Sequence, residues 1–204
     1  MYNFTVPMAL MDFVPVVFFG ITAVLLLGDL YNKMSKGIYG FFAAGCVNVF
    51  LAGFCKALWK LLYAANICDF KALEEMFMPV NSLGLLFVGL ALIGMLIWKK
   101  KSVMLSTAPV AVTSSLPFIM MMVVGLGGMC ASLSILAVKM KKGRNMIFFI
   151  LSFLCAMGMG AMSGMDMSLA WVNWAEQGIN TVSQLCLTLG TIQLHKAGLK
   201  DWAW

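Results

Sequence analysis

Residues 13–31 read FVPVVFFGITAVLLLGDLY, and this stretch decides the fold class of the chain. An apolar helix of about 20 residues is long enough to cross the hydrocarbon core of a bilayer. Five further stretches have the same character, and together the six occupy well over half of the sequence. They are residues 38–62, 76–98, 116–138, 146–165 and 172–194. The sequence therefore predicts an all-α integral membrane protein with six transmembrane helices.

The overall composition supports this class. The 204 residues are 62% hydrophobic and 11% charged, with a mean hydropathy of +0.95. Soluble domains are about 45–50% apolar and about 25% charged, so a soluble protein, a disordered chain and a nucleic-acid binder are all excluded. The net charge of +6 comes from loop Lys and Arg, as membrane insertion produces. No soluble catalytic domain fits between the predicted spans.

Three short motifs occur twice in the same order, which indicates an internal repeat. The first copy covers residues 1–101 and the second covers residues 102–204, both within a single membrane domain. The pairs are Thr5–Ala9 with Thr107–Ala111, Lys33–Gly37 with Lys139–Gly143, and Val80–Leu83 with Ile179–Val182. Chance similarity between apolar strings is the alternative.

Three helices per copy is an odd number, so the second copy must cross in the opposite sense. This predicts two inverted three-helix repeats, related by an axis in the membrane plane. The basic residues then divide almost evenly between the two sides, with a slight excess that favours both termini in the cytoplasm. An additional helix within residues 102–115 would make the copies parallel, but Pro109 and the Ser and Thr content argue against one.

The last predicted helix carries a polar stripe. Glu176, Asn180, Gln184 and Thr188 recur every four residues and share one broad face. Each group needs a partner or water at membrane depth. One interpretation is the wall of a path for a polar solute. The other is hydrogen bonding between helices, at about 0.6–2 kcal/mol each.

Other polar residues lie in the second and third predicted helices. Asn48 is expected near mid-membrane, and Asn81 lies early in the third helix. We expect Lys60 to extend its ammonium group to the interface, whereas Lys56 could face inward and pair with a carboxylate. We expect Asp12 at headgroup level, at the start of the first helix.

Metal, cofactor and enzyme chemistry find little support. None of the six cysteines belongs to a CxxC motif, and His195 is the single histidine. The methionine-rich tract Met157–Met167 could bind Cu(I), but flexible core packing explains it better. We therefore expect no metal, no cofactor and no enzymatic activity.

Several local strings resemble the small six-helix amide and urea channels of bacteria. They are Lys33-x-x-Lys36, Phe41–Gly45, Gly84–Phe87 and Glu176–Ile179, with Gly28-Asp29 where that family has Asn-Gly. The resemblance covers about a third of the chain. It implies a six-helix fold and a passage for a small neutral solute.

These observations predict a channel or transporter for a small polar or neutral solute. The path would follow the interface between the repeats, lined by Asn48, Asn81, Glu176, Asn180, Gln184 and Thr188, with Lys56 in a possible ion pair. The alternative is a non-catalytic subunit of a larger complex, for substrate capture or as a scaffold. Expected partners are the bilayer of the cell membrane, the solute, and a second copy or another membrane subunit, but no nucleic acid. An open gap in the bundle would favour the channel, and a fully packed centre would count against it.

Overall fold

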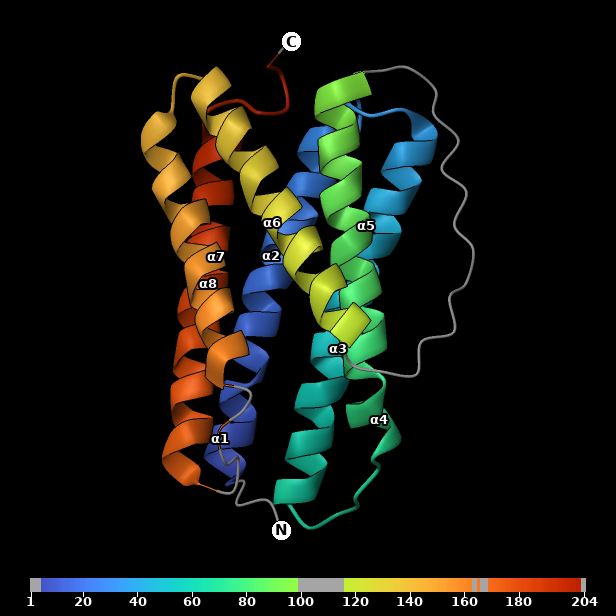
Figure 1. Cartoon of the computed structure of the whole chain (residues 1–204), viewed down its shortest axis with the longest axis vertical. Coiled ribbons are helices and arrows are strands. Elements are labelled where there is room, and N and C mark those ends of the chain that lie inside the picture. Colours follow the sequence, from blue (N-terminus) through green and yellow to red (C-terminus); the bar gives the residue numbers. More distant parts are fainter. Residues whose placement is uncertain (1–4, 99–115, 163–164, 166–168, 203–204) are drawn as a thin grey trace.

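The computed structural model describes residues 5–98, 116–162, 165 and 169–202, and all regular structure in them is helical (Figure 1). Six of the described helices are long, and they follow one another in two triplets. In the first triplet, one short helix precedes the first long helix and another lies between the second and the third. The second triplet includes a single 3₁₀ turn. The elements are α1 (Val6–Met11), α2 (Phe13–Leu30), α3 (Lys36–Ala64), α4 (Ala72–Glu75), α5 (Phe77–Trp98), α6 (Leu116–Lys139), η1 (Gly143–Asn145), α7 (Met146–Met162) and α8 (Ala170–Lys196).

Among the described residues, five helical stretches are long and apolar enough to cross a membrane. They are Val6–Leu30, Lys36–Ala64, Ala72–Trp98, Leu116–Lys139 and Gly143–Met162. Large apolar side chains on their outer faces are exposed, as at Val24, Leu51 and Leu154. The chain is therefore a multi-pass membrane protein. The sixth predicted span corresponds to α8, which has the length but not the apolar character of the other five.

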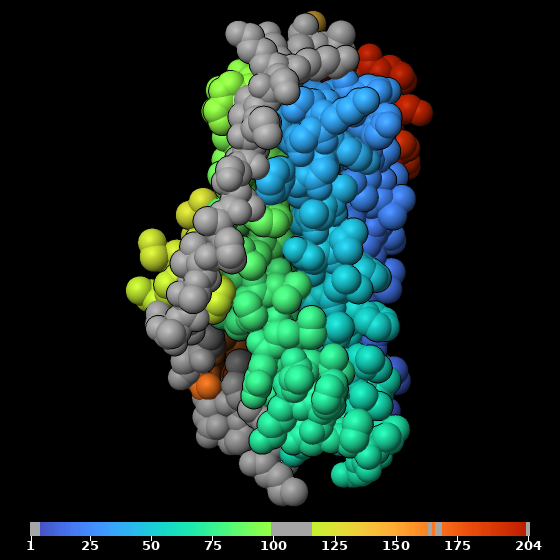
Figure 2. All heavy atoms as spheres, turned by 90° about the vertical axis from the view of Figure 1, so that its right-hand side faces the viewer, coloured from blue at the N-terminus to red at the C-terminus, as the bar shows by residue number. Residues whose placement is uncertain are grey.

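The six long helices form a closed ring. Each packs against its neighbours in the chain, and α8 returns to pack against α2. Figure 2 shows α3 and α5 side by side along one face of the molecule. Two glycine contacts bring helices unusually close: a Cβ on Gly45 of α3 would lie 2.7 Å from the carbonyl oxygen of Gly84 in α5, and a Cβ on Gly125 of α6 would meet the backbone of Leu85 in α5.

The helix directions do not confirm the predicted inverted repeat. Thr22 of α2 lies beside Thr188 of α8, and Asp29 lies beside His195 about two turns further along each helix, so α2 and α8 are parallel. Within each triplet neighbouring helices are antiparallel, and α5 and α6 are parallel to each other (Figure 1). Both triplets therefore run in the same sense, as parallel copies would. Residues 102–115, where the sequence disfavoured an additional helix, lie outside the described residues.

The parallel triplets also change the distribution of charge. The start of α1 and the end of α8 lie at opposite ends of the bundle, here named the N end and the C end, so the first and last described helices do not begin and end on one side as predicted (Figure 1). The even division of basic residues between the two sides was predicted on the assumption of an inverted repeat. With parallel triplets the division is uneven. The described basic residues gathered at the C end are Lys33, Lys36, Lys139, Lys141, Lys142, Arg144, Lys196 and Lys200; Lys99–Lys101 lie outside the described residues.

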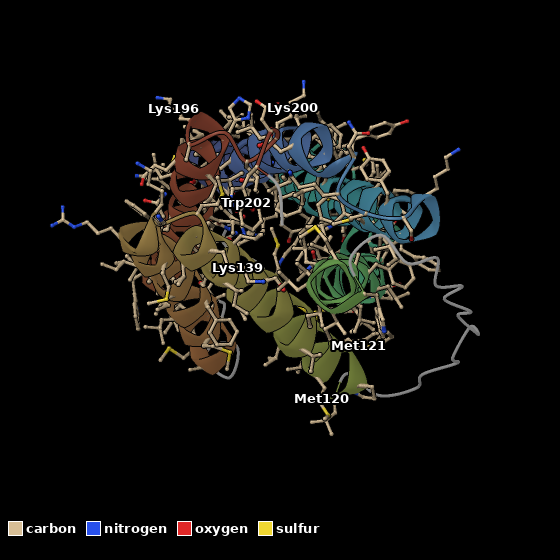
Figure 3. All side chains as sticks on the ribbon, turned by 90° about the horizontal axis from the view of Figure 1, so that it is seen from above. Met120, Met121, Lys139, Lys196, Lys200 and Trp202 are labelled. Carbon is tan, nitrogen blue, oxygen red and sulfur yellow. The ribbon has the colours of Figure 1, made fainter. Side chains whose placement is uncertain are left out.

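The half of the ring nearer the C end is filled by an apolar core. Side chains from α2, α3, α5 and α6 meet there with no exposed surface, among them Leu26, Phe42, Leu92 and Leu133. The chain after α8 folds over this core, where Lys33 donates a hydrogen bond to the carbonyl oxygen of Trp202. In the view from above, Trp202 lies over the ring, and Met120 points away from it (Figure 3).

Candidate solute-binding site

We name the two halves of the ring the N half and the C half, after the end that each lies nearer. The N half has a polar interior, whereas the interior of the C half is apolar. The N half contains the start of α8, the junction of α1 and α2, and the last turns of α3. Charged and amide side chains there are buried or half-buried rather than exposed. A group of buried polar residues inside membrane-spanning helices marks a candidate functional site.

A buried ion pair anchors this region. The Lys60 ammonium of α3 lies 2.8 Å from an Asp12 carboxylate oxygen, and the two side chains are only 5% and 8% exposed. Both groups are therefore buried against each other within the bundle, and the Lys60 ammonium does not extend away from it to an exposed position. Asp12 lies at the junction of α1 and α2, directly before the first residue of α2, and Lys60 lies about one turn before the end of α3 at Ala64.

Lys56 lies one turn before Lys60 and faces inward. Its ammonium is 4.3 Å from the centre of the Phe77 ring in α5, which gives a cation–π contact. The same ammonium is within electrostatic reach of Asp12 and of Glu176 on α8. Two ammonium groups thus face the carboxylates of Asp12 and Glu176, and Glu74 of α4 is a third carboxylate within electrostatic reach of Lys56.

Three oxygen atoms on α8 are buried without a hydrogen-bond partner. They are Oε1 of Gln177, Oγ1 of Thr181 and Oε1 of Gln184. The residues are spaced by four and three positions, so they lie on one face of the helix. A buried polar atom without a partner costs about 1–3 kcal/mol. These oxygens are therefore positioned to meet water or a polar solute.

The same face changes character towards the C end. The Thr188 hydroxyl lies 3.0 Å from that of Thr22 and 2.9 Å from the Phe18 carbonyl oxygen. The Thr191 hydroxyl donates to the Leu187 carbonyl oxygen at 2.9 Å. At this level the polar side chains of α8 hold helices together, which is the second interpretation of the stripe.

The structure brings some of the predicted lining residues together and separates others. Glu176 and Asn180 are half-buried at the start of α8, and Glu176 is near Lys56. Asn48 is half-buried against α5, and a Cβ placed on Gly84 of α5 would lie 3.0 Å from the Cβ of Asn48. Asn81 is 7% exposed on α5. Asn48 and Asn81 thus belong to α3 and α5, whereas α8 packs against α2 and α7.

Sequence reasoning missed Gln177 and Thr181. Residues spaced by four positions are offset by about 40° around the helix at each step, so the predicted stripe drifts around α8. Spacings that alternate between four and three stay on one face, and Gln177, Thr181, Gln184 and Thr188 follow that pattern. Testing this spacing would have identified them.

Two further observations concern metal and acid–base chemistry. In the described ranges, no group of three His, Cys, Asp or Glu residues is placed to hold a metal ion. The Nδ1 atom of His195 lies 2.9 Å from the carboxylate of Asp29, at the C end and away from the polar cluster. Gly164, Asp166 and Met167 lie outside the described residues, so the end of the methionine-rich tract is not described.

Comparison with known proteins finds no matching family model, no matching curated protein and no matching solved structure. The class is therefore set by the fold and the site alone. The chain is a multi-pass helical membrane protein with a buried polar cluster in one half of its bundle.

Proposed function

We propose that the protein is a transporter for a small polar solute, which enters the ring from the N end and binds in the N half. The observation that carries the proposal is the row of unpartnered oxygens at Gln177, Thr181 and Gln184. Their cost is offset when a solute with N–H or O–H groups hydrogen-bonds to them. A role in helix packing alone would be expected to pair each oxygen with a donor on a neighbouring helix, as Thr188 is paired with Thr22.

The charges of the N half favour a solute without net charge. Asp12 and Glu176 face Lys56 and Lys60, and Glu74 is a third carboxylate near Lys56, so an anion would add to the charge already in slight excess, and a cation would compete with ammonium groups that these carboxylates already face. The resemblance to amide and urea channels points to the same class of solute. We therefore propose a neutral or zwitterionic solute of a few heavy atoms.

The packed C half indicates that transport needs a conformational change. Leu26, Phe42, Leu92 and Leu133 have no exposed surface and block the centre of the ring. A permanently open pore would need polar groups or water along its whole length. We propose that this structure is closed at the C end and that the apolar core must part for release.

The proposal treats α8 as a sixth membrane crossing. It has 27 residues, and at about 1.5 Å per residue it is long enough to span a bilayer. Its polar face packs against α2 and α7 inside the ring, so its composition need not match that of a lipid-facing helix.

Transport assays in liposomes test this function. Volume recovery would be followed by stopped flow with urea, small amides, glycerol and water. The Gln177→Leu/Gln184→Leu variant should lose the acceleration, as should Asn180→Leu/Gln184→Leu. Thr191→Val is the matched control and should retain it, because Thr191 bonds only within its own helix. If no solute moves faster than in empty vesicles, the transport proposal fails.

The packed C half also favours the second candidate, a membrane subunit that binds a solute and passes it to a partner. The two candidates differ in one measurement. A subunit of this kind would bind solute in equilibrium dialysis, with loss of binding in Gln177→Leu/Gln184→Leu, but would show no transport on its own.

A further inference from the structure

A groove on the outer surface, far from the polar cluster, lies between α6 and α7. It has a volume of about 300 Å³ and is lined by Ser134, Ile135, Val138, Lys139 and Met146. Three of these side chains are large and apolar yet exposed: Ile135 at 44%, Val138 at 55% and Met146 at 36%. The groove is therefore an apolar furrow with one cationic residue at its edge.

The mouth of the groove lies at the most basic part of the chain. Lys139 ends α6, and the turn that joins α6 to α7 carries Lys141, Lys142 and Arg144, all exposed. The described acidic residues at the C end are Asp29, which is buried against His195, and Asp201. Neither lines the groove. A ligand with an anionic head and an apolar tail matches this arrangement.

The distribution of charge also fixes the surroundings of the groove. An excess of Lys and Arg marks the cytoplasmic side of a membrane protein, and the C end carries that excess. The cytoplasmic leaflet is where anionic phospholipids collect, and basic pockets between transmembrane helices bind their headgroups. The groove runs from the basic turn along α6 towards the membrane interior, as an acyl chain does.

We infer that the α6–α7 groove binds one anionic phospholipid, with its phosphate on Lys139 and the basic turn and an acyl chain along Ile135, Val138 and Met146. The site is independent of solute transport. It ties the end of α6 to the start of α7.

Lipid retention by the purified full-length chain tests the site. The protein would be extracted from vesicles of nine parts phosphatidylcholine to one part phosphatidylglycerol, and bound lipid would be counted by native mass spectrometry. We expect one phosphatidylglycerol to be retained. The Lys139→Gln/Arg144→Gln variant should lower its retention relative to phosphatidylcholine by about 30-fold, since each basic residue near the surface contributes a factor of about five.

Three further variants separate a defined site from diffuse attraction. Lys36→Gln removes an exposed charge from the same end but outside the groove, and should retain the lipid. Val138→Trp fills the groove and should lose it, whereas Val24→Trp, at a 70% exposed position of α2, should not. Lys141 has φ +58°, a conformation that glycine adopts without strain. Lys141→Gly therefore removes a charge without harming the fold, and should lower retention about fivefold.

The inference is overturned if Lys36→Gln lowers retention as much as Lys139→Gln/Arg144→Gln, or if Val138→Trp keeps the lipid. It is also overturned if inorganic phosphate displaces the lipid, because the groove would then contribute nothing beyond an anion contact.

Discussion

The two halves of the bundle are built from the same six helices but are held together by different forces. In the C half, apolar side chains such as Leu92 and Leu133 pack with no exposed surface. In the N half, a buried ion pair and hydrogen-bonding side chains occupy the equivalent space. The packing of the C half therefore stabilises the fold, whereas the buried polar groups of the N half lower its stability.

Breaking the ion pair should have the largest effect. Lys60→Met leaves the Asp12 carboxylate buried without its partner, which costs about 3–5 kcal/mol of the free energy of unfolding. Replacing both residues by apolar ones, as in Asp12→Leu/Lys60→Met, should restore most of that loss. Denaturant unfolding in detergent micelles, followed by circular dichroism, measures both variants.

The double variant provides the control for this prediction. If it is as unstable as Lys60→Met, the two residues contribute separately and the N half is not organised by their pairing. The cation–π contact between Lys56 and Phe77 involves neither substituted residue, so we expect it to persist in both variants.

A cavity in the C half should have the next largest effect. Leu92 is fully buried among residues of the core, so Leu92→Ala should lower the free energy of unfolding by about 2–5 kcal/mol. Gln184→Leu in the N half should be neutral or stabilising, because it removes a buried oxygen that has no partner. The same unfolding measurement compares the two variants directly. Equal losses would show that the halves do not differ in the way proposed.

The fold class followed from the sequence, because apolar stretches of helical length have few alternatives in a bilayer. Residues 13–31, 38–62 and 116–138 all correspond to long helices within a few residues. The relative direction of the two triplets could not be predicted, since it depends on which helices pack together and not on their periodicity. Gly89 and Gly125 determine that packing by allowing α5 and α6 to approach in parallel, and neither differs in local pattern from other glycines.

The candidate site could be predicted only in part for a similar reason. Glu176, Asn180 and Gln184 stand out as polar residues in an apolar chain, so composition was enough to find the start of α8. The pairing of Asp12 with Lys60 joins two residues on different helices, and such a contact depends on tertiary structure. Local rules placed each of them separately at an interface.

The smallest change in the free energy of unfolding is expected at the boundary between the two halves. Thr22 and Thr188 share a hydrogen bond of 3.0 Å where the unpartnered oxygens end and the apolar core begins. In Thr22→Val the Thr188 hydroxyl still has the Phe18 carbonyl oxygen at 2.9 Å, so the loss should be only about 0.6 kcal/mol. Thr22→Ser, which keeps the hydroxyl, is the control in the same unfolding measurement. A loss of several kcal/mol would mean that Thr188 depends on Thr22 alone, and the polar half would then extend one turn further towards the C end.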